Sequence, residues 1–367
     1  MARLKEYNGH YCESEYEYAF IGFLEAEGWK YSSGNNIHRV TKRDILIVDD
    51  FKKFIADTNP DLTEEEVTQI YDNVRLVGAE SDFATLHKVY GWMVNGVQFT
   101  PQDGLPRMIP LIDFDNLDKN IFRVVNQFTV EYTNNGQKEN RRLDVLLFVN
   151  GMPLCVVELK NPADANATIY DAWEQINIRY WRDIPHLLHY CPLACISDGV
   201  KTRLGTVRTP YEHFYAWRRV TEGDAVSTLP FAETETMIKG VYAPERFLEI
   251  FRDYIYFQDS IYDSDEVEIV CRYPQFFAAR LLKQSIIKSV IEKSGKGGTY
   301  FGATGCGKTY TMAFLARQLA LRCTDIPEIG SPTIILIVDR DELQKQGSKL
   351  FTKSKEFLNL GEVSVVK

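Results

Sequence analysis

The stretch 141–162, RRLDVLLFVNGMPLCVVELKNP, constrains the fold of this 367-residue chain more than any other. Asn150-Gly151 at its middle is typical of a two-residue type I′ turn, because that turn needs a positive φ at both residues. The runs 143–149 and 154–160 on either side are apolar and have the length of buried strands. The sequence therefore predicts a β-hairpin, which Asn161-Pro162 ends.

Three charged residues interrupt or end these apolar runs. Asp144 lies early in the first strand, and Glu158 and Lys160 close the second. Because alternate residues of a strand point to the same face, Glu158 and Lys160 can point at one locus. Glu158 directly follows the apolar run 154–157, so its charge requires a partner or a metal ion.

These residue types suit the hydrolysis of a phosphodiester bond. Two carboxylates, together with water and a backbone carbonyl such as that of Val157, suit Mg²⁺, which prefers oxygen ligands. The metal polarises the phosphate and lowers the pKa of a bound water, while a lysine orients that water or offsets charge in the transition state. We therefore predict that Asp144 and Glu158 are catalytic metal ligands and that Lys160 is catalytic. The alternative for this spacing is a solvated strand end without chemistry.

Charge and cysteine content limit the classes of protein to which the chain can belong. A net charge of −9 excludes a general polyanion binder, so contact with nucleic acid requires a local basic patch. Residues 201–220 carry five basic residues and one acid, which fits such a patch or an ordinary solvated surface. The cysteines are scattered, no apolar signal core begins the chain, and no stretch approaches about 18 apolar residues. We expect a cytoplasmic protein that does not associate with a membrane.

The elements around the hairpin follow the order helix, three strands, helix and strand. Hydrophobic spacing predicts helices over 13–28 and 165–181 and further strands over 122–132 and 193–197. Residues 44–95 are expected to form three helices, over 44–57, from a Thr63–Glu66 capping box onward, and over 82–94. An aromatic helix is expected over 243–260. Acids in the first helix suit its dipole, and Glu15 is a candidate for assisting the metal site.

A second motif lies at 302–309, GATGCGKT, and matches the nucleotide-binding pattern G-x-x-x-x-G-K-[ST]. A short strand over 299–301 and a helix over 309–322 are expected on either side of it. Lys308 is predicted to reach the β- and γ-phosphates of ATP, and the Thr309 hydroxyl to bind the nucleotide's Mg²⁺. The residues predicted to wrap the phosphates with backbone N–H groups are Thr304, Gly305, Cys306 and Gly307.

Two neighbouring features extend this prediction. Ile334–Val338 is a continuous apolar run, typical of a buried parallel strand. Gln275, which lies about 27 residues before the P-loop, resembles the adenine-reading glutamine of superfamily 2 helicases. Its amide offers the donor and the acceptor that an adenine edge requires, and the alternative is an ordinary surface glutamine.

The pattern of Asp144, Glu158 and Lys160 resembles the PD-(D/E)xK nuclease motif, with Leu143 in place of the proline. A nuclease motif followed by a helicase P-loop resembles the restriction (R) subunit of Type I restriction–modification enzymes. The stretches that carry this resemblance over most of the chain are IDFDNLDKNIFRVVNQFTV at 112–130, RRLDVLLFVNGMPLCVVELKNP at 141–162, ISDGVKTRLGT at 196–206, GATGCGKTYTM at 302–312 and VDRDELQKQ at 338–346.

The resemblance implies a Type I site-specific deoxyribonuclease that cuts double-stranded DNA with Mg²⁺, is driven along DNA by ATP, and works with methyltransferase (M) and specificity (S) subunits. The family carries Gln-x-x-x-Tyr in the helix after the nuclease motif. Here Gln175 and Tyr180 are one residue further apart, so an α-helix would place Gln175 beside Arg179. Both remain candidate supporting residues. The arginines that are candidates for gripping the DNA backbone are Arg141, Arg142, Arg179 and Arg182.

We therefore expect an α/β protein with a PD-(D/E)xK endonuclease domain over 1–220, in which a mixed sheet is flanked by helices and a helical elaboration covers about 30–115. A linker and packing helix over 221–268 and the start of a RecA-like superfamily 2 helicase domain over 269–367 are expected to follow. No Asp-Glu box follows the P-loop before Lys367, so we expect the N-terminal fragment of a longer polypeptide.

Two alternatives remain open at this stage. A Type III-like or repair helicase–nuclease would lack a methyltransferase partner. A degenerate nuclease fold that serves as a DNA-binding or docking module would bind no metal at Asp144 and Glu158.

Overall fold

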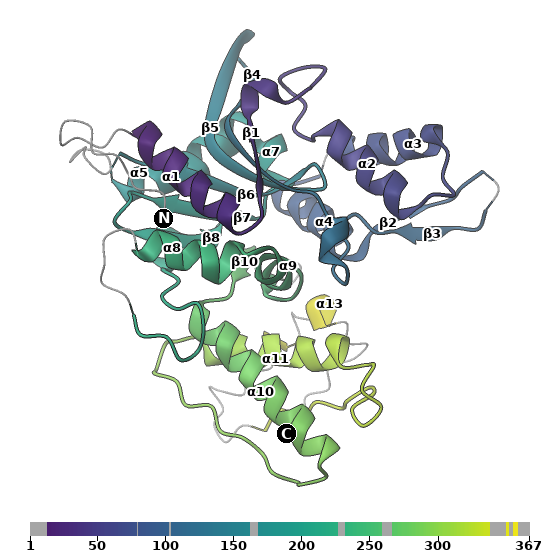
Figure 1. The fold of residues 1–367 in the computed structure, drawn as a ribbon, viewed down its shortest axis with the longest axis vertical. Helices are drawn as coiled ribbons and strands as arrows, with labels where there is room; N and C mark the ends of the chain where they lie inside the picture. Colours follow the sequence, from purple (N-terminus) through teal and green to yellow (C-terminus); the bar gives the residue numbers. More distant parts are fainter. Residues whose placement is uncertain are drawn as a thin grey trace. The chain divides into compact units, whose positions relative to one another are not determined.

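The computed structural model describes residues 13–78, 80–102, 104–161, 168–226, 232–258, 266–337, 350–351 and 355–358. The described residues form two compact units, one up to Leu248 and the other from Glu249 onward. Each unit has its own helices and strands (Figure 1). Within the described part, no helix is long and apolar enough to cross a membrane.

The first unit is built on a six-stranded mixed sheet with the strand order β1-β4-β5-β6-β7-β8 (Figure 1). β1 runs parallel to β4 and β6 runs parallel to β7, whereas the other neighbours are antiparallel. Every residue of β6 is buried, as expected for a strand with a neighbour on each side and both faces covered. The strands are β1 (Lys30–Ser33), β4 (Phe122–Asn134), β5 (Gln137–Val149), β6 (Met152–Leu159), β7 (Leu193–Ser197) and β8 (Thr202–Thr206).

Helices pack around this sheet, and the expected α/β class is confirmed. Before β4 lie α1 (Glu13–Ala26), α2 (Val48–Thr58), α3 (Glu64–Arg75), α4 (Asp82–Asn95) and the pair β2 (Val97–Phe99) and β3 (Arg107–Ile109). After β6 lie α5 (Ile169–Glu174), the π-helical segment η3 (Gln175–Tyr180), α6 (Trp181–Asp183), α7 (Pro185–Leu188), α8 (Ala232–Met237) and a second π-helical segment, η5 (Ile238–Tyr242). Short 3₁₀ segments are η1 (Gly34–Asn36), η2 (Leu117–Lys119) and η4 (Tyr211–His213). α9 (Pro244–Asp253) runs across the division between the units.

The predicted hairpin turn is confirmed and is anchored to two other segments. Asn150 and Gly151 have φ values of 50° and 78°. The Asn150 side-chain amide donates hydrogen bonds to Leu111 O at 3.0 Å and to Asn120 Oδ1 at 2.8 Å. The Ile47 N–H donates to Gly151 O at 2.8 Å, just before α2 begins. α2 starts four residues later than the expected Asp44, because the Ile47 N–H bonds to the hairpin and not to a preceding helical turn. The Ile47 carbonyl accepts the Phe51 N–H at 3.0 Å, so Ile47 is the N-cap of α2.

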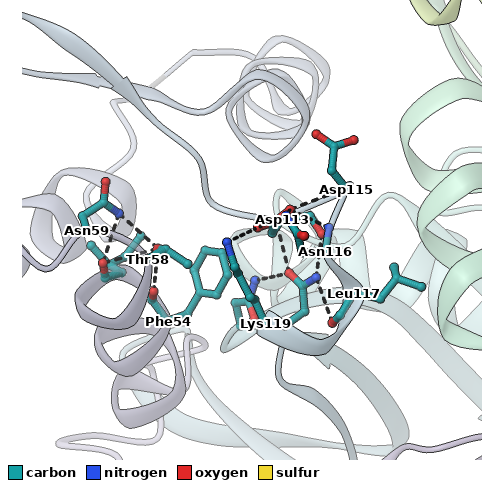
Figure 2. Close-up of polar contacts among 11 residues, drawn as sticks. Phe54, Thr58, Asn59, Asp113, Asp115, Asn116, Leu117 and Lys119 are labelled. Carbon is teal, nitrogen blue, oxygen red and sulfur yellow. Dashed lines mark hydrogen bonds and ion pairs between the residues drawn. The ribbon is translucent and has the colours of Figure 1, made fainter.

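The loop that receives Asn150 is ordered by side-chain contacts of its own (Figure 2). Asp113 Oδ1 accepts the backbone N–H groups of Asp115 at 3.1 Å and Asn116 at 2.8 Å, and Lys119 Nζ lies 3.3 Å from Asp113 Oδ2. Such Asx contacts satisfy backbone groups that no strand or helix can reach. The loop thus presents Asn120 to the hairpin in a fixed position.

The helical elaboration contains the three expected helices, which gather with the β2–β3 pair beside the sheet (Figure 1). The Thr63–Glu66 capping box is present at the start of α3. At the end of α2, the Thr58 hydroxyl donates to Phe54 O at 2.7 Å and the Asn59 amide to Ile55 O at 3.0 Å (Figure 2). These bonds satisfy carbonyl groups that the end of a helix leaves without partners.

A chain of buried hydroxyl groups joins α1 and α8 to the ends of β7 and β8. Tyr16 OH lies 2.6 Å from Ser197 Oγ and 3.0 Å from Thr234 Oγ1. Thr202 Oγ1 lies 2.7 Å from each of the latter two oxygens. Burial raises the pKa of Tyr16 to about 12, so its hydroxyl stays neutral and can donate. Because the four groups satisfy one another, their burial is not costly.

Two regions differ from the sequence-based expectations. Residues 232–242 lie within the expected linker but form helical turns in which Met237, Ile238 and Gly240 are buried. The aromatic helix expected over 243–260 ends at Asp253, and β9 (Ile255–Gln258) follows it. Its residues pair with β10 (Val267–Val270), because a run of tyrosine, isoleucine and phenylalanine suits a strand as well as a helix once a partner strand exists.

The second unit contains the β9–β10 pair, α10 (Tyr273–Ile291), α11 (Lys308–Arg322) and α13 (Lys355–Leu358). The strands expected over 299–301 and 334–338 are not formed in its described residues. Phe301 is 93% exposed and Ile337 is 87% exposed. A parallel strand needs neighbours for its backbone groups, and the strands described in this unit, β9 and β10, pair with each other. Val338 lies outside the described residues.

Candidate active site

Asp144 and Glu158 face each other across the central hairpin. Val145 pairs with Val157, and extending this antiparallel register by one residue sets Asp144 opposite Glu158. Directly opposed residues have Cβ atoms about 4.5–5.5 Å apart. The Leu159 N–H donates to Asp144 Oδ2 at 2.8 Å, while no donor from the described residues reaches Asp144 Oδ1. The structure thus brings together the two carboxylates that were predicted to bind a metal.

The environment of Glu158 opposes a second negative charge. Its side chain is 1% exposed, and burial raises its pKa well above the usual range, with a further increase from Asp144. The positive charge of Lys160 lowers the pKa of Glu158 and so partly offsets these increases. Crowded, desolvated carboxylates of this kind are stabilised by a bound cation. Among the described residues, no group of three or more His, Cys, Asp or Glu side chains could hold a metal, so a cation here would also need backbone or water oxygens, which suits Mg²⁺.

Four side chains form a closed ring of hydrogen bonds around this carboxylate. Lys160 Nζ lies 3.1 Å from Glu158 Oε1 and 3.0 Å from Gln175 Oε1. The Gln175 amide donates to Tyr180 OH at 2.7 Å, and Tyr180 OH donates to Glu158 Oε2 at 2.9 Å. Burial, and then the charge of Glu158, raises the pKa of Tyr180, so the hydroxyl keeps the proton that it donates. The ring fixes the orientation of both Glu158 and Lys160.

The π-helical segment η3 explains how Gln175 and Tyr180 meet. A π-helix closes hydrogen bonds between residues five apart, so residues at that spacing share a face. Gln175 still lies near Arg179, since both residues line one pocket, but its amide bonds to Tyr180. Arg179 pairs with Glu174 at 2.5 Å, again five residues away. The extra residue relative to Gln-x-x-x-Tyr is absorbed within this one turn.

A glutamate of α1 other than the predicted Glu15 contacts the strand beside the site. Glu15 is half-buried, whereas Glu17 is 4% exposed and accepts hydrogen bonds from Asn126 Nδ2 at 2.6 Å and Gln127 Nε2 at 2.5 Å. Gln127 has a φ of 52°, and the register of β4 with β5 sets it opposite Asp144. The helical spacing of Glu17 with Phe20 and Leu24, on the apolar face, was the sequence signal that could have identified it.

The four arginines that were predicted to grip DNA have different surroundings. Arg141 Nε donates to Asp183 Oδ2 at 2.7 Å, and Arg182 Nε donates to Asp183 Oδ1 at 2.8 Å. Arg179 has Glu174 as its partner. Arg142 is exposed, and no acid of the described residues pairs with it.

The basic stretch 201–220 is partly engaged in packing. Arg203 lies over the ring of Tyr211, and Arg208 lies over the rings of Phe83 and Trp181. These contacts use the planar faces of the guanidinium groups, so the stretch is not simply a solvated surface.

In the second unit, the glycine-rich loop 302–307 precedes a helix as expected. Lys308 begins α11, and Gly305 and Gly307 have φ values of 78° and 79°, which glycine adopts without strain. Lys308 Nζ donates to Gly302 O at 2.8 Å and to Ala303 O at 2.9 Å. Its charge therefore lies within the loop. Of the other predicted ligands, Thr304 and Gly305 are exposed and Cys306 and Thr309 are half-buried.

Gln275 contacts the same loop from the start of α10. It is 3% exposed, its Oε1 accepts the Arg272 N–H at 2.8 Å, and its Nε2 donates to Gly307 O at 3.2 Å. Both ends of the amide are thus engaged by backbone groups. The predicted contact with adenine would require these bonds to change.

The comparison with protein families identifies the first unit. The model of the Type I restriction enzyme R protein N terminus matches residues 11–213, more than half of the chain. The chain belongs to that family. The resemblance inferred from the sequence to R subunits of Type I restriction enzymes is therefore confirmed. Residues 274–363 of this R protein N-terminal family member are also similar to the SWI2/SNF2 ATPase family.

Individual relatives agree with this membership. The chain is 29% identical over 92% of its length to a putative Type I restriction enzyme MjaIXP endonuclease subunit of Methanocaldococcus jannaschii. It is 28% identical over 94% of its length to the Type I restriction enzyme HindI endonuclease subunit of Haemophilus influenzae. The chain spans about a third of the length of these relatives, 34% and 33% respectively.

Proposed function

We propose that the first unit is a PD-(D/E)xK endonuclease domain that cuts double-stranded DNA with Mg²⁺ within a Type I restriction enzyme. The observation that carries this proposal is the cross-strand pair of Asp144 and Glu158, with Lys160 bonded to the buried carboxylate. Membership of the R protein N-terminal family supports the general role.

Asp144 and Glu158 would hold the metal, with the Val157 carbonyl as a further oxygen ligand. A bound Mg²⁺ supplies positive charge that polarises a phosphodiester and acidifies a coordinated water. Asp144 Oδ1 accepts no hydrogen bond from the described residues, and each Glu158 oxygen has lone pairs beyond those that Lys160 and Tyr180 use. Val157 is fully buried in the strand directly before Glu158.

Lys160 has the position to orient the attacking water and to offset charge on the phosphate. Its ammonium group is held by Glu158 and Gln175, and its side chain is 15% exposed. The Lys160 ammonium group has three N–H donors, and Glu158 and Gln175 accept two of them. The third donor therefore stays available for the water or the phosphate. Gln175 and Tyr180 act as positioning residues, because they contact the lysine and the glutamate.

We further propose that the second unit binds ATP and belongs to a DNA-translocating motor. The loop glycines and the start of α11 would receive the phosphates, Lys308 would leave Gly302 O and Ala303 O to bind them, and Thr309 would bind the nucleotide's Mg²⁺. Methyltransferase and specificity subunits are the proposed partners, since the relatives are named as endonuclease subunits of Type I restriction enzymes.

Cleavage of plasmid DNA by the full-length R polypeptide, assembled with its methyltransferase and specificity subunits, tests both parts. Asp144→Ala, Glu158→Ala and Lys160→Ala should each abolish cutting while ATP hydrolysis continues. Lys308→Ala should abolish ATP hydrolysis and cutting but leave methylation intact. Lys30→Ala, which removes an exposed lysine of the first unit, is the control. ATP-dependent cutting by Lys160→Ala would refute the assignment of the active site. Absence of Mg²⁺ binding at Asp144 and Glu158 in calorimetry would instead indicate a docking module.

A further inference from the structure

A polar pocket of about 140 Å³ opens beside the hydrogen-bonded ring. It is lined by Asn140, Arg141, Arg142, Gln175, Arg179 and Tyr180. Three of these side chains are cationic and none is acidic. In a chain with a net charge of −9, a cavity with such walls suits an anionic ligand.

The charges at this pocket are not equally available. Arg141 donates to Asp183, which Arg182 also contacts, and Arg179 pairs with Glu174. The described residues provide no acid for Arg142, which is exposed. The positive charge that a ligand can use therefore comes mainly from Arg142.

The pocket adjoins the candidate active site in two ways. Gln175 and Tyr180 line the pocket and also bond to Lys160 and Glu158, so a ligand in the pocket would lie one side chain away from Lys160 and Glu158. Arg142 and Asp144 are two residues apart in β5 and therefore point to the same face of the sheet. A molecule that extends along this face would contact both Arg142 in the pocket and Asp144 in the candidate active site.

We propose that this pocket holds a backbone phosphate of the DNA strand that is cut, next to the phosphate at Asp144 and Glu158, with Arg142 as its principal ligand. The inference rests on the proposed nuclease function. A guanidinium group offers parallel N–H donors that match two phosphate oxygens, and Asn140 adds a neutral amide donor. Contacts of this kind fix the register of the strand and carry no sequence information.

The salt dependence of DNA binding tests the proposal. Binding of a fluorescent duplex to the 367-residue chain is measured by anisotropy without divalent metal, in a series of salt concentrations. Each phosphate contact contributes about one unit to the slope of log K against log salt concentration. Arg142→Ala should weaken binding and reduce the slope by about one unit, whereas Arg142→Lys should keep the slope.

Lys30→Ala is the matched control. Lys30 is exposed at the start of β1, and its substitution removes the same charge from the same unit at a site that does not line the pocket. Its slope should equal that of the unchanged chain. Melting temperatures of all three variants show whether the fold is intact.

Two results would overturn the proposal: a slope for Arg142→Ala equal to that for Lys30→Ala, or a chain that does not bind duplex DNA. Cleavage by Asp144→Ala is assayed separately in the assembled enzyme. If that variant still cuts, the nuclease function fails. If it does not cut while Arg142→Ala binds with an unchanged slope, the phosphate pocket alone fails.

Discussion

The Gln175 side-chain amide donates to the Tyr180 hydroxyl at 2.7 Å across a single π-helical turn. In an α-helix these residues, five apart, would point in different directions. The turn therefore compensates for one additional residue and preserves a ring on which Glu158 and Lys160 depend. Two predictions concern this ring directly.

Deletion of Ile178 should be tolerated. Its side chain is 48% exposed, and its removal leaves Gln175 and Tyr180 at the four-residue spacing that an ordinary α-helix places on one face. We expect the assembled enzyme to keep its cleavage activity. Insertion of an alanine after Ile178 is the control, because it sets the two residues six apart. Equal loss of activity in both variants would show that the four-residue spacing does not replace the π-helical turn, and full activity in both would show that the ring does not matter for cutting.

Tyr180→Phe should reduce both stability and cleavage. The change leaves a buried Glu158 oxygen without its donor and the Gln175 amide without its acceptor, which should lower the free energy of unfolding by about 1–3 kcal/mol. Denaturant titration measures the first effect and plasmid cleavage the second. Tyr170→Phe is the control, since Tyr170 is 46% exposed and contacts aromatic rings instead. A Tyr180→Phe protein as stable and active as this control would contradict the prediction.

Two glycines in equivalent hairpin turns should respond differently to alanine. Gly136 and Gly151 have φ values of 79° and 78°, so alanine at either costs about 1–2 kcal/mol from the left-handed backbone. A Cβ at Gly136 meets no atom within 4 Å, whereas a Cβ at Gly151 overlaps Ile47 O and Phe51 N. Gly151→Ala should therefore destabilise the protein clearly more than Gly136→Ala in denaturant titrations. Equal losses would mean that α2 can move away from the hairpin.

His186 should make the protein less stable in acid. Burial, with smaller contributions from Arg43 and His189, lowers its pKa to about 4, and its Nε2 has no hydrogen-bond partner among the described residues. In the unfolded chain His186 binds a proton with a pKa near 6.5, whereas in the folded protein it stays neutral until the pH approaches 4. Stability should be complete above pH 6.5 and should fall by on the order of 3 kcal/mol as the pH decreases through 4.

The difference between the unchanged protein and His186→Gln isolates this effect from other titrating groups. Thermal unfolding from pH 7 to pH 4 should show a weaker pH dependence for His186→Gln. His38→Gln, which removes a side chain that is 75% exposed, should behave like the unchanged protein. Parallel curves for all three proteins would contradict the assignment of His186.

The elements that local rules determine could be predicted from the sequence. Asn150-Gly151 specifies its turn through backbone sterics, and the Thr63–Glu66 capping box specifies the start of α3. The nuclease motif grouped Asp144 with Glu158, whereas the turn alone would set Asp144 opposite Val157, because a β-bulge between Leu147 and Phe148 shifts the register of the two strands by one residue.

The features that depend on distant partners could not be predicted. The contact between Gln175 and Tyr180 requires a π turn, which no residue pattern in 165–181 indicates. In the sequence, Glu17 is one acid among several in α1. Its hydrogen bonds with the amides of Asn126 and Gln127 depend on the packing of α1 against β4, which the sequence does not show. The runs 299–301 and 334–338 have strand-like residues, but a strand also needs neighbours, and hydrophobicity does not reveal them.

The hydroxyl chain between Tyr16 and Thr234 has a consequence for the order in which the protein is assembled during translation. The ring around Glu158 uses residues no more than 22 positions apart, so all its members leave the ribosome together. Tyr16 is synthesised early, yet its partners Ser197 and Thr234 follow 181 and 218 positions later. The nascent first helix therefore cannot complete its polar contacts until most of the first unit has emerged. The ring around Glu158 and the attachment of the N-terminal helix to the first unit are thus completed at different times in the synthesis of each new chain.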